Sequence, residues 1–238
     1  INNEENISDL IEFLSIEGIT GYEKKIANAV KNKLIKYGIP EDCIFFDDAN
    51  KKIPLPTETG NLIVKLPGTK TGERVLFSTH LDTVSLCKGA EPILIDNKIT
   101  SKKNTALGAD NRGGVSCLVN MLKHVFRNKL DYYPMTILFT VREESGLWGA
   151  RNVSIEDLGY PTMGFNTDGS SPYQAMTSAV GAERWSVEIF GQGSHAGVAP
   201  EKGISSTRGA SIALSKIFKE GWFGKINKNG KEGTSNIG

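Results

Sequence analysis

The sequence predicts an α/β fold in which strands and helices alternate to build a doubly wound layer. Residues 136–141 (TILFTV) form a short apolar, β-branched run that is typical of a buried strand. Residues 113–128 instead repeat apolar side chains at helical spacing, which is typical of a helix with one buried face. Because such segments follow one another in alternation, we expect helices packed on a sheet.

The other elements of this layer are expected in chain order. Helices are predicted at residues 7–15 and 22–37. Strands are predicted at residues 61–66, 74–78 and 162–166, and a small hairpin at residues 91–100.

The pattern changes after about residue 179, which places a domain boundary there. Residues 184–190 alternate apolar and polar side chains, as in an antiparallel strand with one wet face. A glycine-rich loop and a helix at roughly residues 205–219 follow. We therefore expect domains at 1–179 and 180–238, the second an incomplete α+β unit.

Composition excludes several classes of function. The chain is 39% hydrophobic and 23% charged, as is ordinary for a globular protein. Its net charge of +1 argues against binding to nucleic acid or a membrane surface through bulk charge. Three cysteines without a C-x-x-C pattern favour a reducing compartment, so a cytoplasmic location is expected.

Two adjacent carboxylates, Glu143 and Glu144, follow the buried run at residues 136–141. They could be solvated surface residues, which is the commonest fate of glutamate. Chemistry in an open α/β sheet gathers beyond the carboxyl ends of strands, however. Because like charges repel, we expect a cation or two different roles to separate this pair.

Further polar residues follow the neighbouring predicted strands. His80 and Asp82 come after residues 74–78 and point the same way on an extended chain, so Asp82 could orient His80 or act as a ligand itself. Asp168 follows residues 162–166, where an ordinary Asp-Gly turn is the alternative.

Asp110 lies just before the predicted helix at 113–128, where it could serve as an N-cap. Glycines at 108, 113 and 114 surround it and permit close backbone approach. One histidine and several carboxylates at consecutive strand ends predict a metal site with nitrogen and oxygen ligands. Such ligands suit zinc, with cobalt or manganese as alternatives, and the number of carboxylates suits two bridged ions.

Five segments, in order, carry a resemblance to a known family. They read STHLDTV, LGADNRGGV, VREESGLWGAR, FNTDG and GSHAGVAPEKGIS. Together they resemble the peptidase T-like dinuclear zinc exopeptidases, relatives of tripeptide aminopeptidases, glutamate carboxypeptidases and aminoacylases. The resemblance runs from about residue 7 to residue 238. It implies a mixed-sheet catalytic domain with an inserted lid or dimerisation domain.

The resemblance also implies a role for each residue at the strand ends. His80 and Asp168 would bind the first zinc, and Asp110 would bridge both ions. The peptide bond between Asp110 and Asn111 would be cis. Glu144 would bind the second zinc. Glu143 would be the general base. Asp82 would orient His80.

Two residues of the second domain match the family's lid. His195 resembles a lid histidine that reaches substrate, often in the partner subunit, and Asn236 resembles a lid asparagine that touches substrate. A homodimer through the lid is therefore expected. The family has one more histidine ligand beyond the lid, so we expect this chain to be an N-terminal fragment with only its first metal site complete.

The resulting expectation is a zinc exopeptidase that acts on small peptides such as tripeptides. Deacylation of N-acyl amino acids by the same metals remains an alternative, as does a non-catalytic metal-binding fragment. The presence of Glu143 favours catalysis, because a scaffold needs no base beside its metals.

Overall fold

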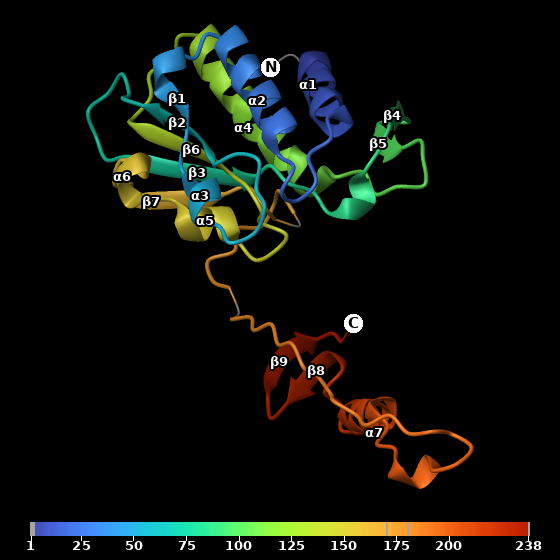
Figure 1. Ribbon diagram of the computed structural model, residues 1–238. Coiled ribbons are helices and arrows are strands. Elements are labelled where there is room, and N and C mark those ends of the chain that lie inside the picture. Colours follow the sequence, from blue (N-terminus) through green and yellow to red (C-terminus); the bar gives the residue numbers. More distant parts are fainter. Residues whose placement is uncertain (1–2, 170, 180, 238) are drawn as a thin grey trace. The chain divides into compact units, whose positions relative to one another are not determined.

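The computed structural model describes residues 3–169, 171–179 and 181–237 (Figure 1). The chain divides into two compact units, Ile1–Met176 and Thr177–Gly238. Each unit is described by itself below.

The first unit is built on a five-stranded sheet with the order β1-β2-β6-β3-β7. The central strand β6 pairs parallel with β3, which pairs parallel with β7, whereas β2 pairs antiparallel with both β1 and β6. The α/β fold with a mixed sheet is therefore as the sequence predicted. The strand bounds are β1 Ile44–Phe46, β2 Leu62–Leu66, β3 Val75–His80, β6 Met135–Thr140 and β7 Met163–Asn166.

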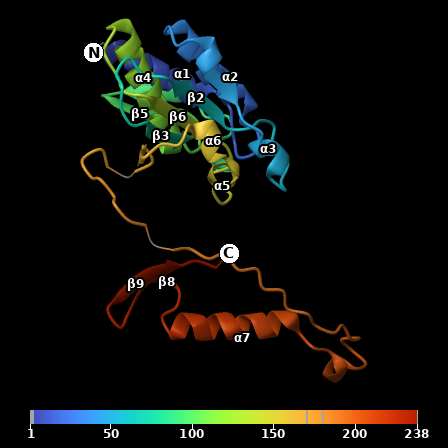
Figure 2. The same ribbon diagram turned by 90° about the vertical axis from the view of Figure 1, so that its left-hand side faces the viewer.

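Helices lie on both faces of this sheet (Figures 1 and 2). The long helices α1, α2 and α4 cover one face, and the short helices α5 and α6 lie on the other. Alternate residues of one strand face the two layers: Leu62 and Val64 join the core under the long helices, while Ile63 packs with Leu138 and Leu158. The helix bounds are α1 Asn3–Ser15, α2 Lys24–Lys36, α3 Ala49–Lys52, α4 Ala109–Arg127, α5 Trp148–Asn152 and α6 Ile155–Leu158.

The regular part of α4 begins close to residue 113, where the sequence predicts the helix to start. Asp110 (φ −82°, ψ 107°) and Asn111 (φ −118°, ψ 39°) are not helical, so the regular helix begins after them. The peptide between them is cis, which confirms the expectation from the resemblance. A Cβ on Gly114 would lie 2.6 Å from the carbonyl oxygen of Thr167, so this glycine lets the first helical turn approach the end of β7.

The predicted hairpin at 91–100 is present as β4 Pro92–Ile95 and β5 Lys98–Ser101, which pair antiparallel. Its two turn residues, Asp96 (φ 47°) and Asn97 (φ 62°), adopt the left-handed conformation that a two-residue hairpin turn requires.

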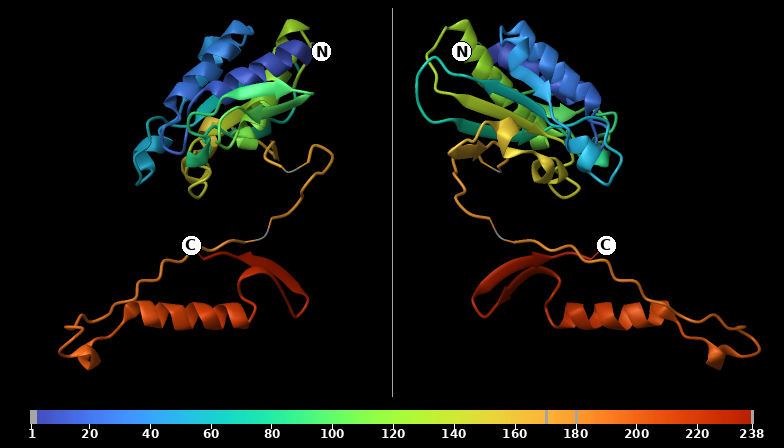
Figure 3. Two further views of the ribbon diagram at one scale, coloured as in Figure 1. Left: turned by 90° about the vertical axis from the view of Figure 1, so that its right-hand side faces the viewer. Right: turned by 60° about the vertical axis from the view of Figure 1, so that its left-hand side comes forward.

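The second unit contains α7 Ser206–Lys219 followed by a hairpin of β8 Gly224–Lys228 and β9 Lys231–Ser235 (Figure 3). The predicted helix is confirmed, and the Ser205 hydroxyl caps it by accepting from the backbone N–H of Arg208 at 3.1 Å. The hairpin was not predicted, although Asn229-Gly230 is a strong hairpin signal and both residues have positive φ.

The strand predicted at residues 184–190 is wrong. This segment is not assigned as a strand, and its apolar side chains stay exposed, 82% for Trp185 and 77% for Val187. A strand requires a hydrogen-bonded neighbour, and no described strand pairs with this segment. Alternation alone therefore did not produce a strand here.

In the part of the chain that the structure describes, the helices are too short or too polar to cross a lipid bilayer.

The three long helices are joined by a buried charge cluster around Asp9. Asp9 is 3% exposed. Its carboxylate accepts hydrogen bonds from the Tyr37 hydroxyl at 2.7 Å, from Lys33 at 3.1 Å and from Lys123 at 3.0 Å. Burial raises the pKa of Asp9, but these donors outweigh it and hold the pKa below its usual value. One carboxylate thus joins α1 to both α2 and α4.

Replacing Asp9 by Asn should lower the free energy of unfolding by about 2–3 kcal/mol at pH 7, because charge-assisted bonds to the buried Lys123 and the partly buried Lys33 are lost. Since the folded-state pKa is depressed, the contribution of Asp9 is present above the unfolded pKa and is lost as the pH falls through the folded pKa. Urea unfolding at several pH values checks this. The gap between Asp9→Asn and the unmodified protein should begin to narrow below about pH 4 and should close as the pH falls through the depressed folded-state pKa. An equal gap at acid and neutral pH would contradict it.

Candidate metal centre and active site

Three strand ends place the polar residues of the site at one edge of the sheet. His80 is the last residue of β3, and its register partner Thr140 is the last residue of β6, so Glu143 and Glu144 follow immediately beyond. The pairing of β3 with β7 continues through the Thr167 N–H, which donates to the Ser78 carbonyl at 2.9 Å and brings Asp168 to the same edge. Because these strands are parallel, their carboxyl ends meet there.

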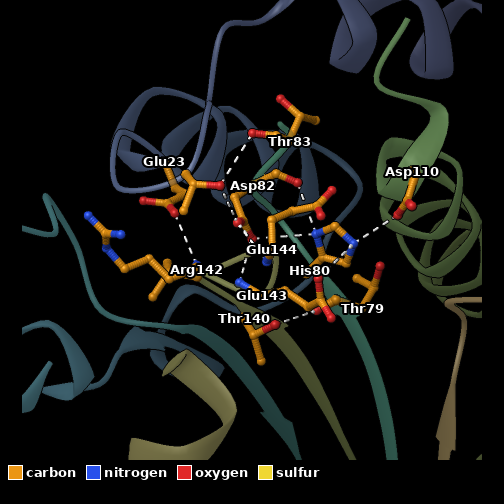
Figure 4. Close-up of polar contacts among 12 residues, drawn as sticks. Glu23, Thr79, His80, Asp82, Thr83, Asp110, Thr140, Arg142, Glu143 and Glu144 are labelled. Atoms are coloured by element: carbon orange, nitrogen blue, oxygen red, sulfur yellow. Dashed lines mark hydrogen bonds and ion pairs between the residues drawn. The ribbon is translucent and has the colours of Figure 1, made fainter. Parts of the chain in front are cut away.

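The imidazole of His80 lies at the centre of this cluster (Figure 4). It is 2% exposed. Its Nδ1 lies 2.9 Å from the carbonyl oxygen of Asp82, which can only accept, so Nδ1 carries the proton. The other nitrogen, Nε2, lies 3.0 Å from Asp110 Oδ1 and 3.7 Å from Asp168 Oδ2, and it offers a lone pair to a metal ion once a cation displaces its proton. This is the tautomer that a metal-binding histidine needs.

Asp82 lies behind His80 and is fully buried. Its carboxylate accepts from the backbone N–H of Glu143 at 2.9 Å and of Glu144 at 3.2 Å, and from the Thr20 hydroxyl at 2.9 Å. Burial raises the pKa of Asp82, but His80 and these donors hold the pKa below its usual value. Asp82 therefore stays ionised and ties the turn after β6 to the loop after β3.

The carboxylates around His80 form two groups whose ligand atoms all lie within 4.8 Å of one another. One group is His80 with Asp110 and Glu144, and the other is His80 with Glu143 and Asp168. The structure thus brings together the five residues predicted as ligands and base, from three strand ends and the start of α4.

The charges of this cluster call for a cation. Burial lowers the pKa of His80, but Asp82, Asp110 and Glu143 raise it to about 9. Burial, with repulsion from neighbouring carboxylates, raises the pKa values of Glu143, Glu144 and Asp168. A divalent ion between these groups would relieve the repulsion. One imidazole and several carboxylates also form a donor set that zinc, manganese or cobalt accepts, so the residues fit such an ion.

The two lid residues predicted to bind substrate belong to the second unit. His195 is exposed, and its Nδ1 accepts from the backbone N–H of Gly197 at 3.2 Å. Asn236 is exposed and directly follows β9. Their roles at the site stay predictions.

Sequence reasoning missed the buried residues that support the cluster, including Glu23, Asn61 and Arg142. A glutamate near a helix start and an arginine before two glutamates look like solvated surface residues. Only their burial, 0% for Glu23 and 9% for Arg142, reveals a different role. No signal in the sequence distinguishes these buried residues from solvated surface residues of the same type.

Comparison with known proteins agrees with this geometry. Residues 61–200, more than half of the chain, match the model of peptidase family M28, and the chain belongs to that family. It is 30% identical over 249 residues to the uncharacterized protein YqjE of Bacillus subtilis (strain 168), a match that covers 100% of this chain and 61% of YqjE.

Two further similarities are to peptidases. Over 157 residues the chain is 31% identical to carboxypeptidase G2 of Pseudomonas sp. (strain RS-16). This match covers 63% of this chain and 37% of carboxypeptidase G2. The crystal structure of aminopeptidase PepT from Bacillus cereus ATCC 10987 superposes with a TM-score of 0.67 at 27% identity, covering 91% of this chain and 57% of that one. The chain thus spans about three-fifths of the length of YqjE and PepT, and the expected resemblance to peptidase T-like enzymes is confirmed.

Replacing Asp82 by Ala should weaken the binding of a divalent metal, with zinc as the probe, about 10–100-fold, since residues that orient a ligating histidine have effects of this size. The variant loses the acceptor for the Glu143 and Glu144 amides, so the turn that carries two carboxylates is released as well. Competition against a chromogenic chelator measures the affinity. Asp48→Ala is a matched control, because Asp48 is an exposed carboxylate that forms a surface ion pair with the exposed Lys51. Unchanged affinity in Asp82→Ala would contradict this role.

Proposed function

We propose that this protein is a metal-dependent exopeptidase of the aminopeptidase type that acts on small peptides such as tripeptides. The observation that carries the proposal is the convergence of His80 with four carboxylates at the carboxyl edge of a parallel strand set. Membership of a peptidase family and the similarity to aminopeptidase PepT support it.

Four residues of this chain would contribute ligands to a site for two zinc ions, with cobalt or manganese as alternatives. His80 and Asp168 would bind the first ion, Glu144 the second, and Asp110 would bridge them. When bound, such a pair lowers the pKa of a water molecule and polarises the carbonyl of the peptide bond. Asp110, with its side chain 74% exposed, is the most accessible of the carboxylates that approach His80. Asp82 holds the His80 ring in the ligating tautomer.

Glu143 would act as the general base. Its Oε2 lies 3.9 Å from His80 Nε2, so it borders the ligands while its side chain remains 28% exposed to an incoming substrate. It would accept the proton of the attacking water and deliver it to the leaving amine. Burial is the main cause of the raised pKa of Glu143, and this shift moves the pKa toward neutral pH, where a group that both accepts and returns a proton is most effective.

The second domain is proposed to act as the lid. We place the catalytic domain at residues 1–179 and the lid at 180–238, where His195 and Asn236 would contact substrate. A homodimer through this lid and a cytoplasmic location complete the proposal.

A second candidate is a carboxypeptidase, which the 31% identity to carboxypeptidase G2 favours. The same hydrolytic centre would serve either reaction. Recognition of the peptide's free amino group or of its free carboxylate decides between them.

Replacing Glu143 by Ala should lower kcat by about 10²–10⁴-fold, the usual contribution of a positioned acid–base group. Metal content should stay unchanged, because the ligands His80, Asp110, Glu144 and Asp168 remain. Steady-state kinetics and elemental analysis of the full-length protein test this. Glu41→Ala, which removes an exposed carboxylate paired with Lys31, is the control. Near-normal turnover in Glu143→Ala would exclude Glu143 as the base.

A peptide panel distinguishes the two candidates. An aminopeptidase should cleave a tripeptide with a C-terminal amide and should leave the N-acetylated tripeptide intact, because it must recognise the free amino group. The reverse pattern would overturn the aminopeptidase proposal in favour of a carboxypeptidase. Mass spectrometry of the products identifies the bond cleaved.

A further inference from the structure

The linker between α1 and α2 lies against the loop that follows β3. The Thr20 N–H donates to the carbonyl of Thr83, and the Thr83 N–H donates to the carbonyl of Gly18, both at 3.1 Å. The Thr20 hydroxyl reaches Asp82, the carboxylate behind His80. This linker therefore borders the candidate active site through its contacts with Asp82 and Thr83, which Figure 4 shows beside His80.

The linker ends in Glu23, a carboxylate with no exposed surface. Its Oε1 accepts from the Gly21 N–H at 2.7 Å and from the Arg142 N–H at 3.0 Å. Its Oε2 has no hydrogen-bond partner among the described residues. A buried charge with one unpaired oxygen is costly for a fold, so stability alone is a weak reason for it.

The hydrogen bond between the Arg142 N–H and Glu23 is one of four that fix the backbone of the turn after β6. Four consecutive N–H groups are held by buried side chains: that of Val141 by Asn61 Oδ1 at 3.1 Å, that of Arg142 by Glu23, and those of Glu143 and Glu144 by Asp82. Arg142 itself adopts a left-handed conformation (φ 52°), which is unusual for an arginine. Glu23 holds the residue at which the backbone turns.

The side chain of Arg142 is anchored away from His80. Its Nε donates to the Thr57 hydroxyl at 2.7 Å, and its Nη2 donates to the carbonyl of Pro56. The space is tight, since a Cβ on Gly21 would lie 2.4 Å from Nη2. Arg142, the residue immediately before the proposed base, is thus fixed twice: its backbone amide by the Glu23 carboxylate, and its guanidinium by Thr57 and Pro56.

We propose that Glu23 is a positioning residue for Glu143, setting through the Arg142 amide where the base carboxylate lies relative to the metal ligands. The proposal rests on the proposed function in taking Glu143 as the base. Among the described residues, the Glu23 carboxylate accepts hydrogen bonds from the Gly21 and Arg142 amides and not from a proposed metal ligand. Because small misplacements of a catalytic group cost up to about 10²-fold in rate, a lost amide bond here affects the chemical step.

Three substitutions separate position from charge. Glu23→Gln keeps an acceptor oxygen at the same reach and removes the charge. Glu23→Asp keeps the charge but is one methylene shorter, so it withdraws the acceptor from Arg142. Glu23→Leu removes both. Asp9→Asn is the matched control, because Asp9 is also a buried carboxylate but accepts from the side chains of Lys33, Tyr37 and Lys123 and not from the turn after β6.

The expected result, in the full-length metal-loaded protein, is a fall in kcat of about 10-fold or more in Glu23→Asp and Glu23→Leu. KM should stay within about twofold and metal content should be normal. Glu23→Gln should recover most of kcat, and Asp9→Asn should lose stability but keep kcat. If Glu23→Leu does not fold, the contrast between the Asp and Gln variants carries the test.

Hydrogen exchange provides a readout that does not depend on activity. The peptide spanning residues 141–147 should exchange faster in Glu23→Asp than in Glu23→Gln, while in Asp9→Asn it should match the unmodified protein. Equal exchange in the Asp and Gln variants overturns the proposal, as does a loss of kcat in Asp9→Asn of the same size. If the unmodified protein cleaves no peptide, the proposed function fails, and the exchange rates still decide whether Glu23 positions the turn.

Discussion

The buried carboxylate of Asp82 connects the parts on which the candidate site depends. Its backbone carbonyl fixes the tautomer of His80, and its side chain binds the Glu143 and Glu144 amides together with the Thr20 hydroxyl. A carboxylate removed from water is costly unless donors surround it. That cost is offset here by donors from two other segments, the turn after β6 and the linker between α1 and α2, so the ionised Asp82 holds both segments against the end of β3.

The site places like charges close together, which a flexible chain would avoid. Repulsion and burial act together on Glu143, Glu144 and Asp168, and the pKa of each is raised accordingly. The scaffold resists their separation because the residues follow parallel strands whose positions are set by ladder hydrogen bonds. Negative charge concentrated in this way attracts a cation, and it accounts for the affinity of such sheet edges for divalent metals.

The turn after β6 illustrates how the supporting residues act. Its four consecutive amides would otherwise be left unsatisfied beyond the end of β6, where none of the described strands continues the ladder. Asn61, Glu23 and Asp82 satisfy them, and each reaches the turn from a different part of the chain. The conformation of the turn therefore depends on long-range contacts rather than on its own residues.

The sequence by itself determined the layered α/β class, most strand and helix positions, and the residues His80, Asp110, Glu143, Glu144 and Asp168 as a set. It could do so because side-chain periodicity reports burial, and because polar residues after apolar strands converge whenever the strands are parallel. Prediction from the sequence failed where an element needs a neighbouring strand. Residues 184–190 have the alternation of a strand, but no described strand pairs with them. It also missed the β8–β9 hairpin despite its Asn-Gly turn.

Only the tertiary structure decided which polar residues support the site. Glu23 lies 119 residues before Arg142 in sequence, and Asn61 lies 80 residues before Val141, yet each binds the backbone of the same turn. Periodicity carries no information about such contacts, because a buried glutamate and a solvated one have the same letter in the sequence. The strand order β6-β3-β7 likewise emerges only when the chain is folded, and that order places the strand-end carboxylates around His80.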